Sequence, residues 1–410
     1  QNTGVRISVK DYSSYNNEGN NWNGAATQLG NDITVGNVPD ILVLDSSLPV
    51  ESYYKKGVFA DLYPFIDSEE NGIDRSDLME NLLKACELNG KLYSIITSYY
   101  FQTLVAKSDF VGTKPGWTIR EMLDAIAKMP EGMVAFSYDF DRSSLQDMLL
   151  SACMGSFVNY ETGETSFNSQ DFIDLIEFLK SCPEKSIQNA YYENIDYDNY
   201  DAQAEQEWYN EYEMRFFKNK ALFMNTYVSS FDAFTYTMQQ FGGNATLIGY
   251  PTTDENSSGA VVYPNMELGI CAASKNTSSA WQFLKYLLTD EQYAKDNYSF
   301  TISKKNMQAK LDQTNQNAEQ NGGNEWTDED WKWYEDNYSE EYVNYLKSSR
   351  MKYTPELGQK VMDIVSTATT VVRYDKKITE IINEELSSFY GGTKSAADTA
   401  GIIDSRAKIY

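Results

Sequence analysis

A ten-residue segment, Gly36–Asp45, restricts the fold more than any other part of the sequence. It reads GNVPDILVLD. Pro39 fixes a turn, Asp40 caps it, and an uninterrupted apolar run follows. Such a run is typical of a parallel strand that is covered on both faces, as in α/β proteins. Asp45 and Ser46 then come at the carboxyl end of this strand, where open α/β sheets bind their ligands.

The length of the chain predicts more than one domain. A sequence of 410 residues is too long for a single hydrophobic core of ordinary size, and 41% hydrophobic residues are enough to fill two. No apolar run approaches the roughly 20 residues that a membrane-spanning helix needs. We therefore expect two α/β domains outside the bilayer.

Charge and composition exclude several classes of function. A net charge of −26 argues against nucleic acid as a partner, because binding to phosphates requires positive charge. The chain has no histidine, which removes the Ser-His-Asp and Cys-His arrangements and histidine-ligated zinc. The four cysteines form no C-x-x-C pair, although their spacing leaves a disulfide open. Phosphate-loop and dinucleotide fingerprints are also missing, so we expect no metal and no cofactor.

Several further strands and turns are predicted from local patterns. Val5–Val9 alternates apolar and polar residues, as a half-buried strand does. Two short strands, Leu92–Ile96 and Thr103–Lys107, are expected on either side of a polar and aromatic break. Thr314–Asn324 is rich in Asn, Gln and Gly and is expected to be a loop.

Helices are predicted where apolar residues recur at helical spacing. Thr118 and Glu121 are three apart and form a capping box at the start of one helix. Phe167–Cys182 carries one apolar face. Tyr191–Tyr212 is expected to be a surface loop that becomes helical near Glu205. The tail is expected to be helical at Thr327–Ser348, Glu356–Leu386 and Ser395–Ile409.

Several segments resemble motifs of the bacterial extracellular solute-binding proteins of the family 1, carbohydrate ABC-importer type. In Phe216–Tyr227 (FFKNKALFMNTY), Asn219 stands where the family has a turn glycine, and we expect it to adopt the left-handed conformation that such a turn needs. The resemblance covers nearly the whole chain. The other matching segments are Gly36–Asp45, Phe59–Ile66 (FADLYPFI), Asn89–Phe110, Val261–Ala273 (VVYPNMELGICAA) and Thr277–Asp290 (TSSAWQFLKYLLTD).

The resemblance implies an α/β, periplasmic-binding-protein-like fold with two lobes, a hinge and an interlobe cleft. Lobe 1 is expected to comprise residues 1–101 and 264–312, and lobe 2 residues 102–263. Residues 313–410 are expected to form a helical tail that packs on lobe 2 and the hinge. The family's first strand and helix would precede Val5–Val9, and if they are absent lobe 1 has an open sheet edge. A dimer formed through that edge is a hypothesis.

The resemblance also implies a function and a location. The expected protein captures a small solute, a mono- or oligosaccharide, in the cleft and passes it to the ABC permease subunits in the membrane. It is expected to be extracellular and lipid-anchored to the membrane of a Gram-positive bacterium, with the anchor upstream of this sequence. No enzymatic activity is expected.

Candidate ligand-binding residues follow from strand ends that the resemblance directs toward the cleft. Sugars present hydroxyl groups and flat C–H faces, so their sites combine aromatic rings with short polar side chains and carboxylates. For each candidate, an ordinary core or surface role is the alternative. The candidates are Tyr12, Asp45, Ser46, Tyr99, Tyr100, Asn225, Tyr227, Tyr263, Asn265 and Glu267.

Two other classes of function stay open. A carbohydrate-active enzyme on the same architecture would need two converging carboxylates, for which Asp139, Asp141 and Glu267 are the candidates. A sensor or scaffold without transport is the second alternative. The acidic stretch Asp196–Glu207 comes near the spacing of a calcium loop, but it has Asp201 where the loop needs glycine, so a solvated surface loop is expected.

Overall fold

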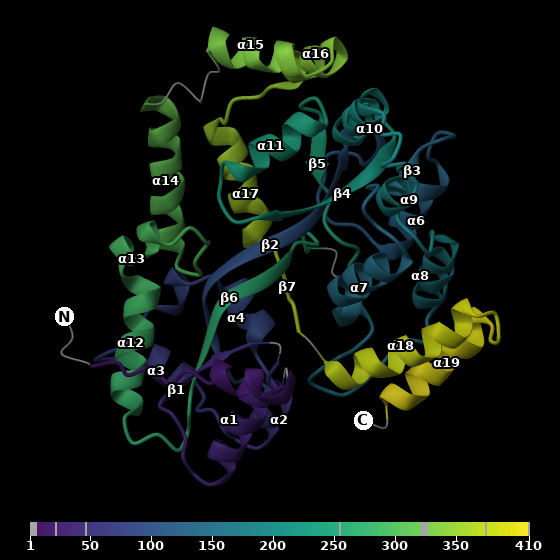
Figure 1. Ribbon diagram of the computed structural model, residues 1–410. Helices are drawn as coiled ribbons and strands as arrows, with labels where there is room; N and C mark the ends of the chain where they lie inside the picture. The colour runs from purple at the N-terminus through teal and green to yellow at the C-terminus, as the bar shows by residue number, and fades with distance from the viewer. Residues whose placement is uncertain are drawn as a thin grey trace. The chain divides into compact units, whose positions relative to one another are not determined.

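The computed structural model describes residues 6–20, 23–45, 47–253, 256–320, 327–373 and 375–408. The chain forms two compact units (Figure 1). Unit 1 comprises Gln1–Tyr100 and Pro264–Lys310, and unit 2 comprises Phe101–Tyr263 and Leu311–Tyr410. The chain passes between the units inside three elements, which are β2 (Ile95–Lys107), β6 (Val261–Ile270) and α14 (Lys304–Gln320).

Unit 1 combines a small sheet with short helices. Strand β1 (Ile41–Leu44) pairs with β6 in antiparallel register, and β6 in turn neighbours β2 in the strand order. The helices of this unit are η1 (Ser13–Asn20), α1 (Gly24–Thr34), α2 (Val50–Lys55), α3 (Tyr63–Ile66), η2 (Arg75–Asp77), α4 (Glu80–Cys86), α12 (Thr277–Thr289) and α13 (Glu291–Asp296).

Strand β1 forms where the sequence predicts it, but its pairing differs from the prediction. It is antiparallel to β6 and lies at the end of the strand order. Leu42 and Leu44 pack into the core around Leu29 and Phe59, whereas Val43 is 59% exposed. The strand is therefore covered on one face only. A run of four apolar residues predicts a strand, but it does not predict which strand will pair with it or in which direction.

Strand β2 replaces the two short strands expected around the Thr97–Phe101 cluster. It is continuous from Ile95 to Lys107, and nearly all of its residues are buried. Thr97 and Ser98 remain in the strand because the interior accommodates their short side chains. The expected break was wrong, since small polar residues interrupt an apolar pattern without interrupting the backbone pairing.

Unit 2 is the larger unit and is built around β2 and β4 (Ala221–Val228). These strands are antiparallel, and β3 (Val134–Phe136) pairs parallel with β4. Two short strands complete the pairing of this unit. Strand β5 (Ala245–Leu247) pairs with β2, and strand β7 (Thr370–Val371) pairs with β6. The helices are α5 (Ser108–Val111), α6 (Ile119–Ala127), α7 (Arg142–Cys153), η3 (Met154–Ser156), α8 (Gln170–Ser181), α9 (Ile187–Glu193), α10 (Ala202–Met214), α11 (Ala233–Gln240), α15 (Asp328–Asn337), α16 (Glu340–Ser349), α17 (Pro355–Ser366), α18 (Lys376–Tyr390) and α19 (Ala396–Ala407).

The core of unit 2 joins the sheet to distant helices. Leu104 and Phe223 are fully buried and belong to the same cluster as Phe172 of α8 and Leu386 of α18. Helices α18 and α19 lie side by side at the end of the described chain (Figure 1). The helical tail is thus part of the core of this unit.

Two local predictions in unit 2 are confirmed. The Thr118 hydroxyl accepts a hydrogen bond from the Glu121 N–H, and the Glu121 carboxylate accepts one from the Thr118 N–H, so the capping box is present. Asn219 has φ +56°, a left-handed conformation that asparagine tolerates better than most residues. This turn leads directly into β4, which carries two of the candidate ligand-binding residues.

Two other local predictions were wrong. Residues 6–9 are irregular in the structure, and Val9 is 85% exposed; Val5 lies outside the described residues. The loop expected from Thr314 is helical as far as Gln320, because α14 continues through this polar sequence. The prediction for Tyr191–Tyr212 is confirmed in outline, since a loop follows the end of α9 at Glu193 and a helix, α10, begins at Ala202, close to Glu205.

Candidate functional site

The first group of interacting polar side chains lies in unit 1 and contains Glu267, Ser94 and Tyr54. The antiparallel register places Glu267 of β6 opposite Leu44, the residue before Asp45. The buried Ser94 hydroxyl donates to Glu267 Oε1 over 2.5 Å, and the Tyr54 hydroxyl lies 2.8 Å from Ser94 Oγ. Serine has one hydroxyl proton, which goes to the carboxylate, so Tyr54 must be the donor to Ser94.

The electrostatics of this group keep Tyr54 protonated. Burial, with the nearby negative charge of Glu267, raises the pKa of Tyr54 well above its ordinary value. The Tyr54 ring also stacks on Tyr93, with ring centroids 5.4 Å apart. The group therefore presents a half-buried carboxylate beside aromatic rings, a combination suited to hydroxyl-rich ligands.

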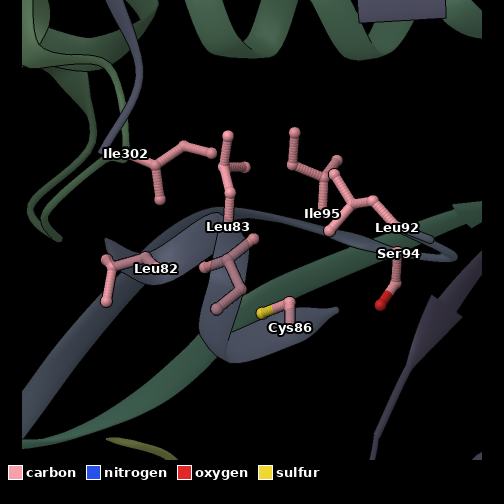
Figure 2. Close-up of a pocket in the computed structure, with 8 residues that line it drawn as sticks. Leu82, Leu83, Cys86, Leu92, Ser94, Ile95 and Ile302 are labelled. Carbon is pink, nitrogen blue, oxygen red and sulfur yellow. The ribbon is translucent and has the colours of Figure 1, made fainter. Parts of the chain in front are cut away.

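A mainly apolar region adjoins Ser94 (Figure 2). It leaves no room for a water-sized molecule. Ser94 is the one hydroxyl-bearing side chain among those labelled in Figure 2, and its partners are Glu267 and Tyr54. The region is packing that supports the polar group, and its lining is Leu82, Leu83, Cys86, Leu92, Ser94, Ile95, Ile96 and Ile302.

The second group lies in unit 2 on one face of the sheet and contains Gln102, Asn225 and Tyr227. In the β2–β4 ladder Gln102 is opposite Tyr227, and Asn225 is two residues from Tyr227 on β4. Side chains two apart on a strand share a face, as do directly opposed ones. The buried Tyr250 hydroxyl donates to Asn225 Oδ1 over 2.5 Å and lies 3.4 Å from Gln102 Oε1. The single Tyr250 proton goes to Asn225, so Tyr250 orients the Asn225 amide, and the Gln102 amide lies next to it.

Tyr227 is the exposed member of this second group. Its side chain is 68% exposed, whereas Tyr250 is 1% exposed. Burial, with the nearby Tyr263, raises the pKa of Tyr250 well above its ordinary value, so its hydroxyl remains a donor. Tyr263 is half-buried and packs against the core of unit 2. An exposed aromatic ring beside two amides is a surface that fits a sugar.

The remaining candidates belong to neither of these two groups. Tyr12 donates its hydroxyl to Asp32 over 2.7 Å. Asp45 is exposed, and its Oδ1 accepts hydrogen bonds from the Ser47 N–H and hydroxyl. Asn265 is exposed and donates to the Ser299 hydroxyl. Tyr100 is half-buried on β2, and Ser46 lies outside the described residues.

Tyr99 requires a correction. Its side chain is 0% exposed, its ring packs on Phe300 with centroids 5.8 Å apart, and its hydroxyl contacts Met79 Sδ. Tyr99 is therefore a core residue of unit 1. The resemblance directed this stretch toward the cleft, but it did not determine which side chains point inward.

The sequence did not point to Tyr54, Ser94, Gln102 or Tyr250. Ser94 and Glu267 are 173 positions apart, and Tyr250 and Gln102 are 148 apart. No local pattern connects residues at such separations. The one available signal was that Ser94 interrupts the apolar Leu92–Ile96 run, since a polar residue in a buried strand needs a hydrogen-bond partner.

Two of the acidic side chains considered for metal binding or catalysis, Asp196 and Asp141, serve as turn and capping residues. No group of three or more Cys, Asp or Glu side chains in it is placed to hold a metal ion. Asp196 accepts hydrogen bonds from the N–H groups of Asp198 and Asn199, as an exposed turn residue does. Asp141 caps α7, where the Ser144 N–H holds the pKa of its carboxyl below the usual range. All four cysteines are thiols.

No helix in the described ranges has both the length and the apolar character needed to cross a membrane. No curated protein sequence matches the chain.

Comparison with solved structures gives the same two-lobed α/β architecture in proteins of low sequence identity. An extracellular solute-binding protein family 1 from Alicyclobacillus acidocaldarius is 14% identical, with a TM-score of 0.50 over 97% of this chain and 93% of that chain.

Two further structures are similar. The sugar-binding protein MalE from Xanthomonas citri is 13% identical, with a TM-score of 0.51 over 94% of this chain and 87% of that chain. A de novo designed esterase is 12% identical, with a TM-score of 0.52 over 97% of this chain and 93% of that chain. At these identities the likeness establishes the fold alone, and it confirms the expected periplasmic-binding-protein-like class.

The sequence model of one family matches residues 12–320, about three quarters of the chain. That family is described as bacterial extracellular solute-binding protein. The chain therefore belongs to the bacterial extracellular solute-binding proteins, as its motifs predicted.

Proposed function

We propose that the protein captures a mono- or oligosaccharide and delivers it to the permease subunits of an ABC importer. The observation that carries the proposal is the exposed Tyr227 ring beside the amides of Gln102 and Asn225. The ring face suits the C–H face of a pyranose, and each amide supplies both donors and acceptors for hydroxyl groups. The sugar-binding protein MalE from Xanthomonas citri, which has the same fold, supports this ligand class.

The proposal assigns ligand contacts in each unit separately. In unit 2 they are Gln102, Asn225, Tyr227 and Tyr263. In unit 1 they are Glu267 and Asp45, with Tyr100 and Asn265 as additional candidates. The lobes of the proposal are residues 1–101 with 264–312 and residues 102–263, with the tail 313–410 on lobe 2 and the hinge, and the two compact units support this division.

The proposal also includes the cellular setting. Members of this family act outside the cytoplasm, and we place this protein at the outer surface of a Gram-positive cell, held by a lipid anchor. Its partners are then the sugar and the permease. The acidic surface, with a net charge of −26, supports a partner other than nucleic acid.

We propose binding without turnover as the activity. A transport family gives the main support, while the designed esterase with the same fold keeps catalysis as the competing function. Glu267 accepts a hydrogen bond from Ser94 and Asp141 caps a helix, so both carboxylates have structural tasks. A glycan panel incubated with the protein is expected to give no hydrolysis product, and release of reducing sugar would establish an enzyme instead.

A calorimetric titration with a panel of mono- and oligosaccharides tests the proposal, and Tyr227→Ala is the informative variant. Loss of one stacking ring is expected to weaken the binding of the best sugar about tenfold. Tyr197→Ala is the matched control, because Tyr197 is also in unit 2 and is 73% exposed. The proposal fails if no sugar binds the wild-type protein or if both variants lose the same affinity.

A further inference from the structure

A third polar and aromatic group in unit 2 is independent of the residues assigned to the sugar. It is formed by three helices that each contribute two side chains at helical spacing, so that each pair lies on one helix face. Helix α10 packs on α16, and all three helices belong to unit 2 (Figure 1). The group, named here the Glu213 cluster, consists of Tyr209 and Glu213 of α10, Tyr236 and Gln240 of α11, and Tyr342 and Tyr345 of α16.

The tyrosines of the Glu213 cluster lie within electrostatic reach of its carboxylate. The charge of Glu213 acts on the hydroxyls of Tyr209, Tyr236 and Tyr342. Burial, with this charge, raises the pKa of Tyr209 to about 12. Tyr209 and Tyr342 pack edge to face with ring centroids 6.1 Å apart. The carboxylate is therefore held among aromatic rings.

Glu213 lacks a donor of its own. Among the residues that the structure describes, no hydrogen bond or ion pair reaches its carboxylate, and burial raises its pKa. Arg215 is the nearest compensating charge, but its guanidinium donates to the Ser137 hydroxyl and the Tyr212 carbonyl and stacks on the Tyr212 ring. Arg215 is thus committed elsewhere, and the carboxylate remains short of positive charge.

A second acceptor in the same cluster also lacks a partner. Gln240 is four residues after Tyr236 on the same face of α11, and its Oε1 atom is buried without a hydrogen bond in the described part of the chain. A buried acceptor without a donor is costly, so it is uncommon in folded proteins. The Glu213 carboxylate and the Gln240 Oε1 atom, both near Tyr236, therefore each need a hydrogen-bond donor from outside the described residues.

The cluster is also accessible from solvent. Tyr236 is 60% exposed and Tyr209 is 40% exposed, and the Glu213 side chain is half-buried. These large rings remain partly exposed although the neighbouring Tyr342 and Tyr345 are buried in a local core with Met214. Exposed aromatic rings around a carboxylate are a common way to bind a cation.

We propose that the Glu213 cluster binds an alkylammonium group, a second ligand class in addition to the proposed sugar. An ammonium group has three donors and no acceptor, which matches a carboxylate and an amide oxygen that both lack donors. The ring faces of Tyr209 and Tyr236 stabilise its positive charge, and the net charge of −26 attracts cations toward the protein. A neutral sugar would gain neither the attraction of a positive charge to the ring faces nor the attraction to the net negative charge of the protein.

Chemical-shift titration of protein with labelled tyrosine rings tests the proposal, with n-butylammonium as the probe and n-butanol as its neutral match. Saturable shifts of the Tyr209 and Tyr236 resonances are expected with the ammonium and not with the alcohol. Glu213→Gln preserves the shape of the side chain and should weaken binding at least about tenfold. Tyr236→Leu removes one ring face and should weaken binding about two- to fivefold.

Glu207→Gln is the matched control, since it removes the same charge from an exposed position of the same helix, and its affinity should stay within about twofold of wild type. A peptide containing lysine, compared with one containing norleucine, distinguishes a free amine from the side chain of a partner protein. Binding of either ammonium source supports the proposal. Equal shifts with n-butanol, or unchanged affinity in Glu213→Gln, would overturn it, and neither result bears on sugar binding.

Discussion

The hydrogen-bonded chain Tyr54–Ser94–Glu267 allows a quantitative prediction about unit 1. Ser94→Ala removes a buried hydroxyl that donates to a carboxylate and accepts from a tyrosine. A hydrogen bond to a charged group contributes about 1.5 to 3 kcal/mol, and a neutral one about 1 kcal/mol. We therefore expect Ser94→Ala to lower the free energy of unfolding by about 3 kcal/mol.

Tyr54→Phe is the comparison, because it removes only the neutral hydrogen bond. Its expected cost is about 1 kcal/mol. The double variant should cost about 1 kcal/mol less than the sum of the single variants, since the Tyr54 hydroxyl that Ser94→Ala leaves without its partner is then absent as well. The coupling arises from the shared 2.8 Å contact.

Urea denaturation of the four proteins, followed by circular dichroism, measures these free energies. The slope of unfolding with urea should be the same for all four, which shows that only stability has changed. Additive single costs, within about 0.3 kcal/mol, would refute the connected chain of hydrogen bonds. A cost below about 0.5 kcal/mol for Ser94→Ala would refute the assignment of Ser94 as the donor to Glu267.

Two further predictions concern backbone strain and pH. Gly249→Ala should destabilise unit 2 by at least about 2 kcal/mol more than Gly132→Ala, because both glycines have positive φ but a Cβ at Gly249 would lie 2.0 Å from the Ser258 carbonyl oxygen; equal melting temperatures would contradict this. Lys394 holds the pKa of Glu385 below its usual range, so the stability from this pair should be present above about pH 5 and lost as pH falls below about 4. Glu385→Gln should therefore cost about 1 to 2 kcal/mol at pH 7 and much less at pH 3, and a cost that does not change with pH would contradict the pairing.

Local patterns predicted elements well where the signal is contained within a few residues. The Thr118 capping box, the left-handed Asn219 and the strand at Ile41–Leu44 were all confirmed. In each case the determining contacts are to neighbours in sequence: a side chain to a nearby N–H, a backbone conformation, a short apolar run. The family resemblance added the fold class, which no local pattern specifies.

Predictions failed where the answer depends on partners far along the chain. The apolar run at Ile41–Leu44 became an antiparallel strand with one exposed face because β6, which begins at Val261, is its partner. The polar sequence after Thr314 stayed helical because it continues α14. Neither the direction of pairing nor the extension of a helix is encoded in the segment itself.

The candidate site illustrates the same limit at the level of single side chains. Strand β2 is buried almost throughout, so it lacks the alternation that tells inward from outward residues. Tyr99 therefore could not be distinguished from a ligand-facing residue by its sequence position. Gln102, three residues later, was overlooked although it lies opposite Tyr227.

The acidic side chains show how tertiary contacts divide similar residues into different tasks. The chain has 60 acidic and 34 basic residues, so many carboxylates have no basic partner and must remain solvated or find neutral donors. Glu385 forms ion pairs with Lys394 and Arg406, and Glu267 accepts a hydrogen bond from the Ser94 hydroxyl. Glu213 is half-buried and has neither kind of partner within the described residues. A carboxylate can be buried without a hydrogen-bond donor from the protein if a ligand supplies that donor. We therefore assign Glu213 to ligand binding, unlike Glu385 and Glu267, whose partners are protein side chains.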